Sequence, residues 1–196
     1  MKGSRVPVSK TEMSPTPTGK LDVNHGCYRI LAGPRGEMGE AIAYVGMRKL
    51  DQLTEDTVDG ALATMIARLD VRRDAFIAQR DDQGLPNADE YREALDAAPL
   101  VMESRLDNTL HAHSQRPGAR ANAGDLARSC GLTETAFWLE YGRLGRRLNA
   151  LLAIEAPKDK TPRQLASLYS FATFDVGARP SDLTITLRPA FLEALQ

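Results

Sequence analysis

The sequence has few cysteines and no long apolar run, and each absence excludes a class of protein. Only two cysteines, Cys27 and Cys130, occur among the 196 residues. They lie far apart without CxxC spacing, which indicates neither a zinc site nor a disulfide framework. No apolar run approaches the ~20 residues of a membrane-spanning helix, and the N-terminus lacks the apolar core of a signal peptide. We therefore expect a cytoplasmic protein with no membrane partner.

The sequence also has almost no net charge. The formal net charge is -1, from 25 Lys/Arg and 26 Asp/Glu, so any contact with nucleic acid must come from a local patch. Residues 115–196 hold 11 Lys/Arg and 8 Asp/Glu, whereas residues 21–114 hold 10 Lys/Arg and 17 Asp/Glu. This asymmetry favours the C-terminal part of the chain as a site of DNA contact.

A catalytic or metal-binding pattern is missing as well. His111 and His113 are two residues apart on a predicted helix, so their side chains diverge by about 200° and cannot share one metal ion. His25 and Cys27 are close enough for a nucleophile and its base, but no third orienting group or oxyanion motif accompanies them. The glycines of residues 33–39 fit no phosphate-binding motif. We expect no catalytic residue, no metal site, no cofactor and no enzymatic activity.

Two segments have a composition that is typical of flexible arms and linkers. Residues 1–25 combine serine, proline and glycine with scattered lysines and show no helical or strand period, which predicts a flexible arm. Residues 83–99 contain a glycine and prolines around a short helix that Asn87 would cap. We interpret residues 83–99 as a linker with a short helix, and therefore as the boundary between two small domains.

The region between these segments, residues 26–82, predicts a small ββ(β)α unit. Short β-prone runs occur at residues 28–32 and 41–45, with a third run at 48–53. Polar capping residues then precede apolar positions at helical spacing, which predicts a helix from Val58 to Gln79 over the sheet.

The start of that helix carries a family resemblance. In Asp56-Thr57-Val58-Asp59-Gly60-Ala61-Leu62, a threonine is followed four residues later by an alanine, directly after the predicted strands. This arrangement resembles HicB-type antitoxins, whose partial RNase-H-like unit ends in such a helix.

Residues 100–196 predict three helices and a hairpin. The helices are expected at 103–114, 124–129 and 134–153, with Gly131 in a tight turn before the third. The string from Asp125 to Thr133 resembles the core pattern of the helix-turn-helix family. After a short helix at 163–168, β-prone runs at 169–174 and 183–188 enclose a long loop, residues 175–182, that has the composition of a wing. The predicted fold class is α+β, with a C-terminal winged helix-turn-helix.

The third helix offers two candidate surfaces. At 100° per residue its buried stripe comprises Phe137, Tyr141, Leu144, Leu148 and Leu151. The opposite face holds Thr135, Leu139, Gly142, Arg143 and Arg146. Arginines on such a face bind guanine or phosphate, so the candidate DNA-binding residues are Thr135, Arg143, Arg146 and, in the wing, Arg179. The outward apolar residues Trp138 and Leu139 are candidates for contact with a protein partner.

Three functions remain open from the sequence. The first is a DNA-binding regulator or accessory protein, with double-stranded DNA as partner. The second is a protein-interaction module, such as an inhibitor of a host or phage protein complex or a homodimer, and the third is an undetected nuclease or transferase. The stretch from Tyr141 to Ala190 also looks like a module of uncharacterised bacterial and phage proteins, which implies a bacterium, phage or mobile element as the source.

Overall fold

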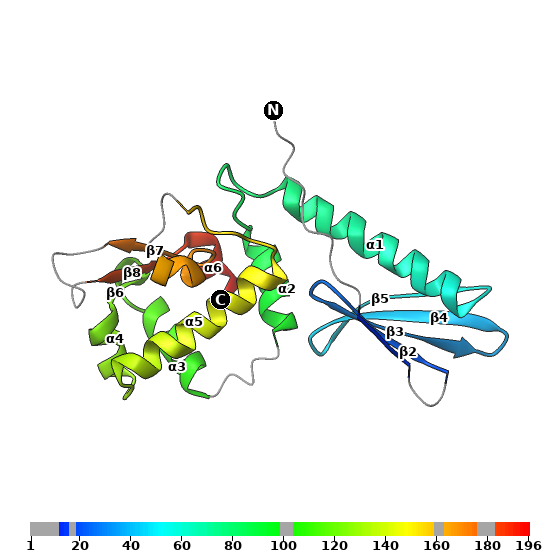
Figure 1. Ribbon diagram of the computed structural model, residues 1–196, viewed down its shortest axis with the longest axis horizontal. Coiled ribbons are helices and arrows are strands. Elements are labelled where there is room, and N and C mark those ends of the chain that lie inside the picture. The colour runs from blue at the N-terminus through cyan, green and yellow to red at the C-terminus, as the bar shows by residue number, and fades with distance from the viewer. Residues whose placement is uncertain (1–11, 16–18, 99–103, 159–162, 176–182) are drawn as a thin grey trace.

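A computed structural model describes residues 12–15, 19–98, 104–158, 163–175 and 183–196, with backbone alone at 12–15, 104–105 and 163–164. The chain is a mixed α+β protein in which two units lie side by side (Figure 1). One unit is an antiparallel sheet with a long helix. The other combines shorter helices with a small sheet.

The first unit is a five-stranded antiparallel sheet in the order β1-β2-β3-β4-β5. Its strands are β1 (Glu12–Pro15), β2 (Leu21–His25), β3 (Tyr28–Arg35), β4 (Met38–Val45) and β5 (Arg48–Glu55). Every second residue is buried from Tyr28 to Ala32 in β3 and from Gly39 to Val45 in β4, as the period of a strand requires, and these residues face helix α1 (Val58–Ala78). The predicted ββ(β) sheet is therefore confirmed in its three strands but extended by two more.

The predicted flexible arm over residues 1–25 is wrong where the strands β1 and β2 lie. Leu21 is opposite Ala32 and His25 is opposite Tyr28 in the register with β3, and Val23 is fully buried. The alternation of Leu21 with Val23 is a strand signal, which the neighbouring proline- and serine-rich composition outweighed in the prediction. Residues 1–11 and 16–18 lie outside the described residues.

Helix α1 begins and ends where the sequence predicts. The Thr57 hydroxyl accepts a hydrogen bond from the Gly60 amide at 3.0 Å, which satisfies one of the free amides at the helix start. Met65 and Leu69 are buried against the sheet, and Gln79 is the C-terminal cap. In Figure 1, α1 lies along one face of the sheet.

The second unit contains helices and a three-stranded antiparallel sheet in the order β6-β8-β7. Its helices are α2 (Ala88–Ala97), α3 (Ser104–Ser114), α4 (Ala123–Ser129), α5 (Glu134–Leu151) and α6 (Pro189–Ala194), with short 3-10 helices η1 (Pro117–Ala119) and η2 (Arg163–Leu168). Its strands are β6 (Arg120–Asn122), β7 (Ala172–Asp175) and β8 (Thr184–Leu187). The helices predicted after residue 100 are confirmed, whereas β6 and α6 were not predicted.

The short helix predicted within residues 83–99 is confirmed as α2, with Asn87 as its cap, but the interpretation of this segment as a linker is wrong, because α2 belongs to the core of the second unit. Tyr91 is fully buried, its hydroxyl donates to the Ser170 carbonyl, and its ring makes an edge contact with Phe191 at 5.4 Å. Tyr91 and Ala94 both join the same apolar cluster as the helices that follow. The apolar spacing of Tyr91, Ala94 and Leu95 is that of an amphipathic helix, so the signal was present in the sequence.

Candidate nucleic-acid interface

Two helices joined by a tight turn form the candidate interface. The Asn122 side chain caps α4 by accepting hydrogen bonds from the Gly124 and Asp125 amides, at 2.9 and 3.2 Å. Gly131 has a φ of 66°, a conformation that residues with a side chain rarely adopt, and it reverses the chain after α4. Thr133 then caps α5 through the Ala136 amide. The predicted tight turn at Gly131 is confirmed. The turn and the two caps together set how α5 follows α4.

Burial along α5 follows the predicted stripe. Phe137, Tyr141, Leu144 and Leu148 are buried in the core, while Leu151 is half-buried at the end of the helix. On the other side, Thr135, Leu139, Arg143 and Arg146 are exposed, as predicted. The helical spacing places these four residues within about 80° of one another. They therefore form one continuous surface.

Gly142 was predicted to lie on the exposed face, and this is wrong. Gly142 is buried, because η2 crosses the helix beside it. At Gly145 an added Cβ would overlap the Ser167 carbonyl oxygen, so only glycine permits this approach of the two backbones. Asn149 continues the contact by donating to the carbonyls of Ala166 and Ser167, at 3.3 and 3.4 Å. The free surface of α5 is therefore narrower than a helical projection indicates.

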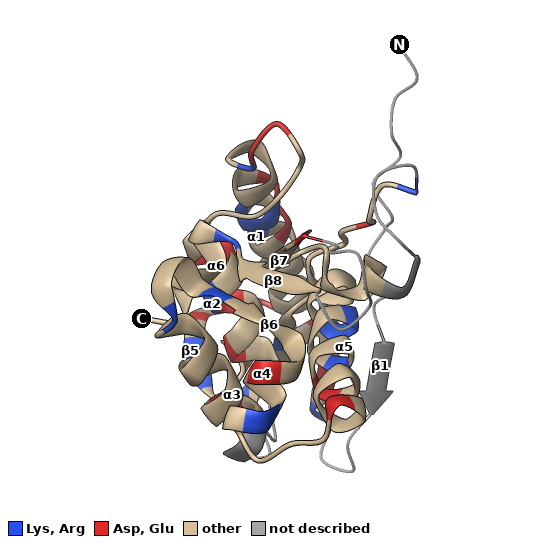
Figure 2. Cartoon of the chain, turned by 90° about the vertical axis from the view of Figure 1, so that its left-hand side faces the viewer, with Lys and Arg blue, Asp and Glu red and all other residues tan. Residues whose placement is uncertain are grey.

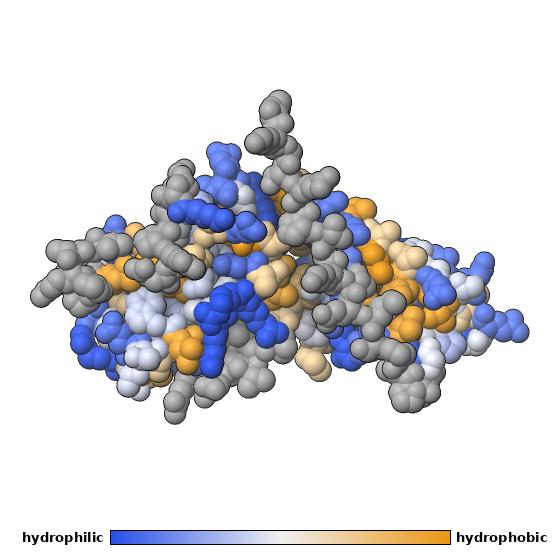
Figure 3. All heavy atoms as spheres, in the orientation of Figure 1, coloured by the Kyte–Doolittle hydropathy of each residue, from blue (hydrophilic) through white to orange (hydrophobic). Residues whose placement is uncertain are grey.

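The exposed surface of α5 carries three arginines, which we call the α5 basic stripe: Arg143, Arg146 and Arg147. Arg143 is paired with Glu140 at 3.2 Å, whereas Arg146 and Arg147 form no ion pair with any carboxylate that the structure describes. Figure 2 shows basic segments along α5, and Figure 3 shows strongly hydrophilic side chains gathered over its second half. Arg147 was not among the predicted site residues, although its spacing of about 40° from Arg143 would have placed it there.

The two apolar candidates differ in their exposure. Leu139 is 47% exposed and borders the α5 basic stripe. Trp138 is half-buried, and its ring makes an edge contact with Phe137 at a centroid distance of 5.2 Å. A partner on this face would thus meet more of Leu139 than of Trp138. Arg179 of the predicted wing lies outside the described residues.

The three histidines and Cys27 differ in their burial and in their neighbours. His113 is fully buried, with ring nitrogens 3.0 Å from the Tyr141 hydroxyl and 3.2 Å from the Ile185 carbonyl oxygen, whereas His111 is exposed. Burial raises the pKa of the Cys27 thiol to about 12, so the group retains its proton at neutral pH and is a poor nucleophile. His25 contacts Asp70 at 2.8 Å. Among the described residues, no three His, Cys, Asp or Glu side chains gather into a potential metal site.

Comparisons with protein-family models, with curated proteins and with solved structures found no match to this chain. None of the helices in the described ranges combines the length and the apolar character that a membrane crossing requires.

Proposed function

We propose that residues from α3 to β8 form a winged helix-turn-helix that binds double-stranded DNA. Three features support this proposal. The helices α3, α4 and α5 are followed by a hairpin, and β6, which precedes α4, pairs with the last strand to give the order β6-β8-β7. The turn before α5 is built on a glycine with positive φ. The loop between β7 and β8 has the sequence position of a wing.

The observation that carries the proposal is the exposed surface of α5. Two features make this surface suitable for the major groove: polar Thr135 lies near the start of the helix, and the α5 basic stripe lies along its second half. Guanidinium groups bind the guanine edge or phosphate oxygens bidentately, and a helix fits the width of the groove. Among the described residues, the core and η2 cover much of the rest of α5, which leaves this face open to DNA.

The test removes two arginines from α5 and, separately, two from the other unit. Arg143→Ala combined with Arg146→Ala should weaken binding to a random duplex by roughly tenfold or more at low salt and reduce the salt slope by about two units, one per lost phosphate contact. The matched control combines Arg29→Ala with Arg68→Ala, which removes the same charge from exposed positions on β3 and α1. Fluorescence anisotropy over a salt series measures the DNA affinity and the salt slope of both double variants. Equal losses in the two double variants, or no binding by the wild-type chain, would contradict the proposal.

The exposure of Leu139 favours a second candidate, a protein-interaction module. Exposed large apolar residues beside a half-buried tryptophan are typical of the centre of a protein interface. In that case Trp138→Ala with Leu139→Ala should abolish self-association or partner capture while the arginine double variant behaves as the wild type. Sedimentation of both double variants, run beside the DNA titration, separates the two candidates.

A further inference from the structure

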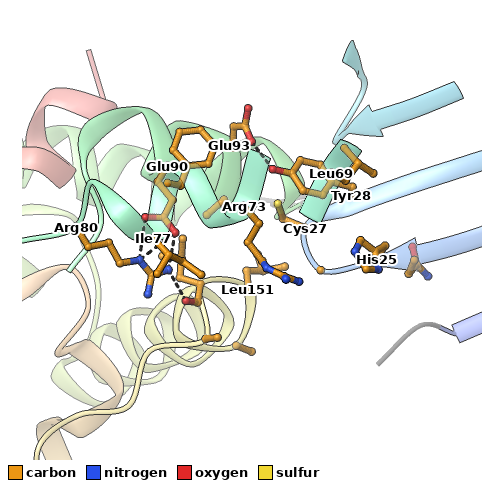
Figure 4. A pocket seen from close by; sticks show the side chains of 17 residues that line it. His25, Cys27, Tyr28, Leu69, Arg73, Ile77, Arg80, Glu90, Glu93 and Leu151 are labelled. Atoms are coloured by element: carbon orange, nitrogen blue, oxygen red, sulfur yellow. Dashed lines mark hydrogen bonds and ion pairs between the residues drawn. The ribbon is translucent and has the colours of Figure 1, made fainter. Parts of the chain in front are cut away.

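A cavity of about 330 Å³ lies where the two units meet. Its walls come from four parts of the chain: the β2–β3 turn, α1, α2 and the end of α5 (Figure 4). Most of the lining is apolar, and the apolar side chains are Leu69, Phe76, Ile77, Ala94, Leu151 and Leu152. A volume of this size, at a junction between units and mainly apolar, is typical of a pocket for a small molecule.

The two carboxylates that line the cavity are already neutralised by neighbours. Glu90 accepts hydrogen bonds from Arg80, one of them at 3.0 Å, and Arg80 also donates to the Leu152 carbonyl at 2.7 Å. Glu93 accepts from the Tyr28 hydroxyl at 2.8 Å and is paired with Arg72. Neither glutamate therefore presents a free negative charge to a ligand. A cationic ligand has no counterpart in this cavity.

Arg73 differs from these groups. Its ion-pair partners are Asp70 at 3.0 Å and Asp74 at 3.4 Å, both on α1 itself and both partly exposed to water. Its Nε is buried and has no acceptor among the residues that the structure describes. In Figure 4 the Arg73 guanidinium lies between the β2–β3 turn and the end of α5, directed into the cavity. Arg73 is thus a lining charge whose partners are water-exposed carboxylates of its own helix and whose buried Nε has no acceptor among the described residues, and its fork of donors matches a carboxylate.

We propose that this cavity binds a small apolar carboxylic acid, with its carboxylate on Arg73 and its hydrocarbon part against the apolar walls. Each methylene moved from water to these walls favours binding, while the carboxylate replaces the water-exposed partners of Arg73 with a partner inside the cavity. The wall supplied by Ala150, Leu151 and Leu152 closes the site only when the two units are together. The proposal is independent of DNA binding.

Octanoate serves as the probe, with octanamide as the uncharged molecule of the same shape. Titration calorimetry should show octanoate binding at least about tenfold more tightly than octanamide, because the carboxylate pairs with the guanidinium as an opposite charge, whereas the amide offers it only a neutral acceptor. Octanoate should also raise the melting temperature of the full chain, and the rise should continue with the logarithm of its concentration above the Kd.

Three variants locate the site. Arg73→Gln should weaken octanoate binding by about tenfold and leave octanamide binding unchanged. Arg68→Gln, an exposed arginine on the same helix, is the matched control and should change neither. Ala150→Trp fills the cavity from an exposed position on α5 and should abolish binding of both molecules, with circular dichroism confirming the fold. The proposal is overturned by the absence of octanoate binding, by equal affinities for octanoate and octanamide, or by unchanged binding in Ala150→Trp.

Discussion

His113 is fully buried in the helical unit, and its environment fixes its protonation state. The Ile185 carbonyl oxygen can only accept, so the nearby Nε2 donates and Nδ1 accepts from the Tyr141 hydroxyl. Burial is the main cause that lowers the pKa of His113 to about 4 from the usual 6.5. The neutral imidazole therefore connects α3, α5 and β8 at neutral pH.

This lowered pKa predicts a pH-dependent stability. Between about pH 4 and pH 6.5 the unfolded chain binds a proton at this position that the folded chain does not bind. The free energy of unfolding should consequently be highest above pH 6.5 and fall as the pH decreases, by at most about 1.4 kcal/mol per pH unit from this group. Urea unfolding at a series of pH values measures this dependence of the free energy of unfolding on pH. Subtracting the profile of His113→Gln should isolate the effect, and His111→Gln, which changes an exposed histidine, should leave the profile as it is.

Residue-level prediction from the sequence succeeded where helical spacing alone decides exposure. The positions of Arg143 and Arg146 follow from 100° steps along a helix whose apolar stripe is clear. The burial of Gly142 does not follow from such steps, because it depends on a segment some twenty residues further along the chain. The pairing of Tyr28 with Glu93 is equally invisible in sequence, since it joins groups 65 residues apart.

At the scale of elements, the contact between α5 and η2 depends on one glycine more than on its neighbour. Gly145→Ala should place a methyl group on the Ser167 carbonyl oxygen and so force η2 away from the helix. Overpacking of this kind should lower the free energy of unfolding by ~1–3 kcal/mol or more. At Gly142 the nearest atoms to an added Cβ are the mobile Arg146 Nη1 at 3.3 Å and Ser167 Oγ at 3.8 Å. Gly142→Ala should therefore be neutral or stabilising by up to about 1 kcal/mol through helix propensity.

Thermal and urea unfolding of these two variants provide the comparison. Both add one methyl group to the same helix, three residues apart, so a difference between them reports the contact with η2 and not the propensity. Similar unfolding free energies for Gly142→Ala and Gly145→Ala would show that η2 does not pack on α5 in this way.

Element boundaries were predictable wherever local chemistry sets them. Thr57, Asn87 and Thr133 cap their helices through side-chain oxygens, and Gly131 reverses the chain with a positive φ. Each of these depends on residues within four positions, which the sequence displays. The strand β6 was missed because a strand of three residues is stabilised mainly by its partner, here residues 184–186.

For the whole molecule, α2 decides how the two units are joined. Tyr91 is in the core of the helical unit, while Glu93 on the same helix holds the Tyr28 hydroxyl of the sheet unit at 2.8 Å. The composition of residues 83–99 predicts a linker, but composition carries no information about contacts between residues that lie far apart in the sequence, such as Tyr28 and Glu93. Because one helix packs in both units, we expect the sheet unit and the helical unit to unfold together.

Removal of the ion pair between Arg80 and Glu90 tests whether the two units unfold together. Their side chains are only 12% and 8% exposed, and Arg80 also donates to the Leu152 carbonyl at the end of α5. Arg80→Met leaves a buried carboxylate without its partner, which should cost about 3–5 kcal/mol, whereas Arg80→Met with Glu90→Met removes both charges and should recover most of that loss. Arg92→Met is the matched control on α2, the helix that carries Glu90. It removes water-exposed contacts with Asp89 at 2.6 Å and with Glu193 at 3.6 Å, so the change should stay below about 1 kcal/mol.

Calorimetry distinguishes the outcomes. The wild-type chain should unfold in one transition whose calorimetric and van't Hoff enthalpies agree. Arg80→Met should lower the melting temperature. It should also divide the transition into two where the contact between the units is lost before their cores unfold, because the sheet unit and the helical unit each have their own apolar cluster. The double variant should restore a single transition, since two methionines fill the junction without an unpaired charge. A single variant no less stable than the double variant would show that burial of Glu90 carries no penalty and that the pair does not hold the units together.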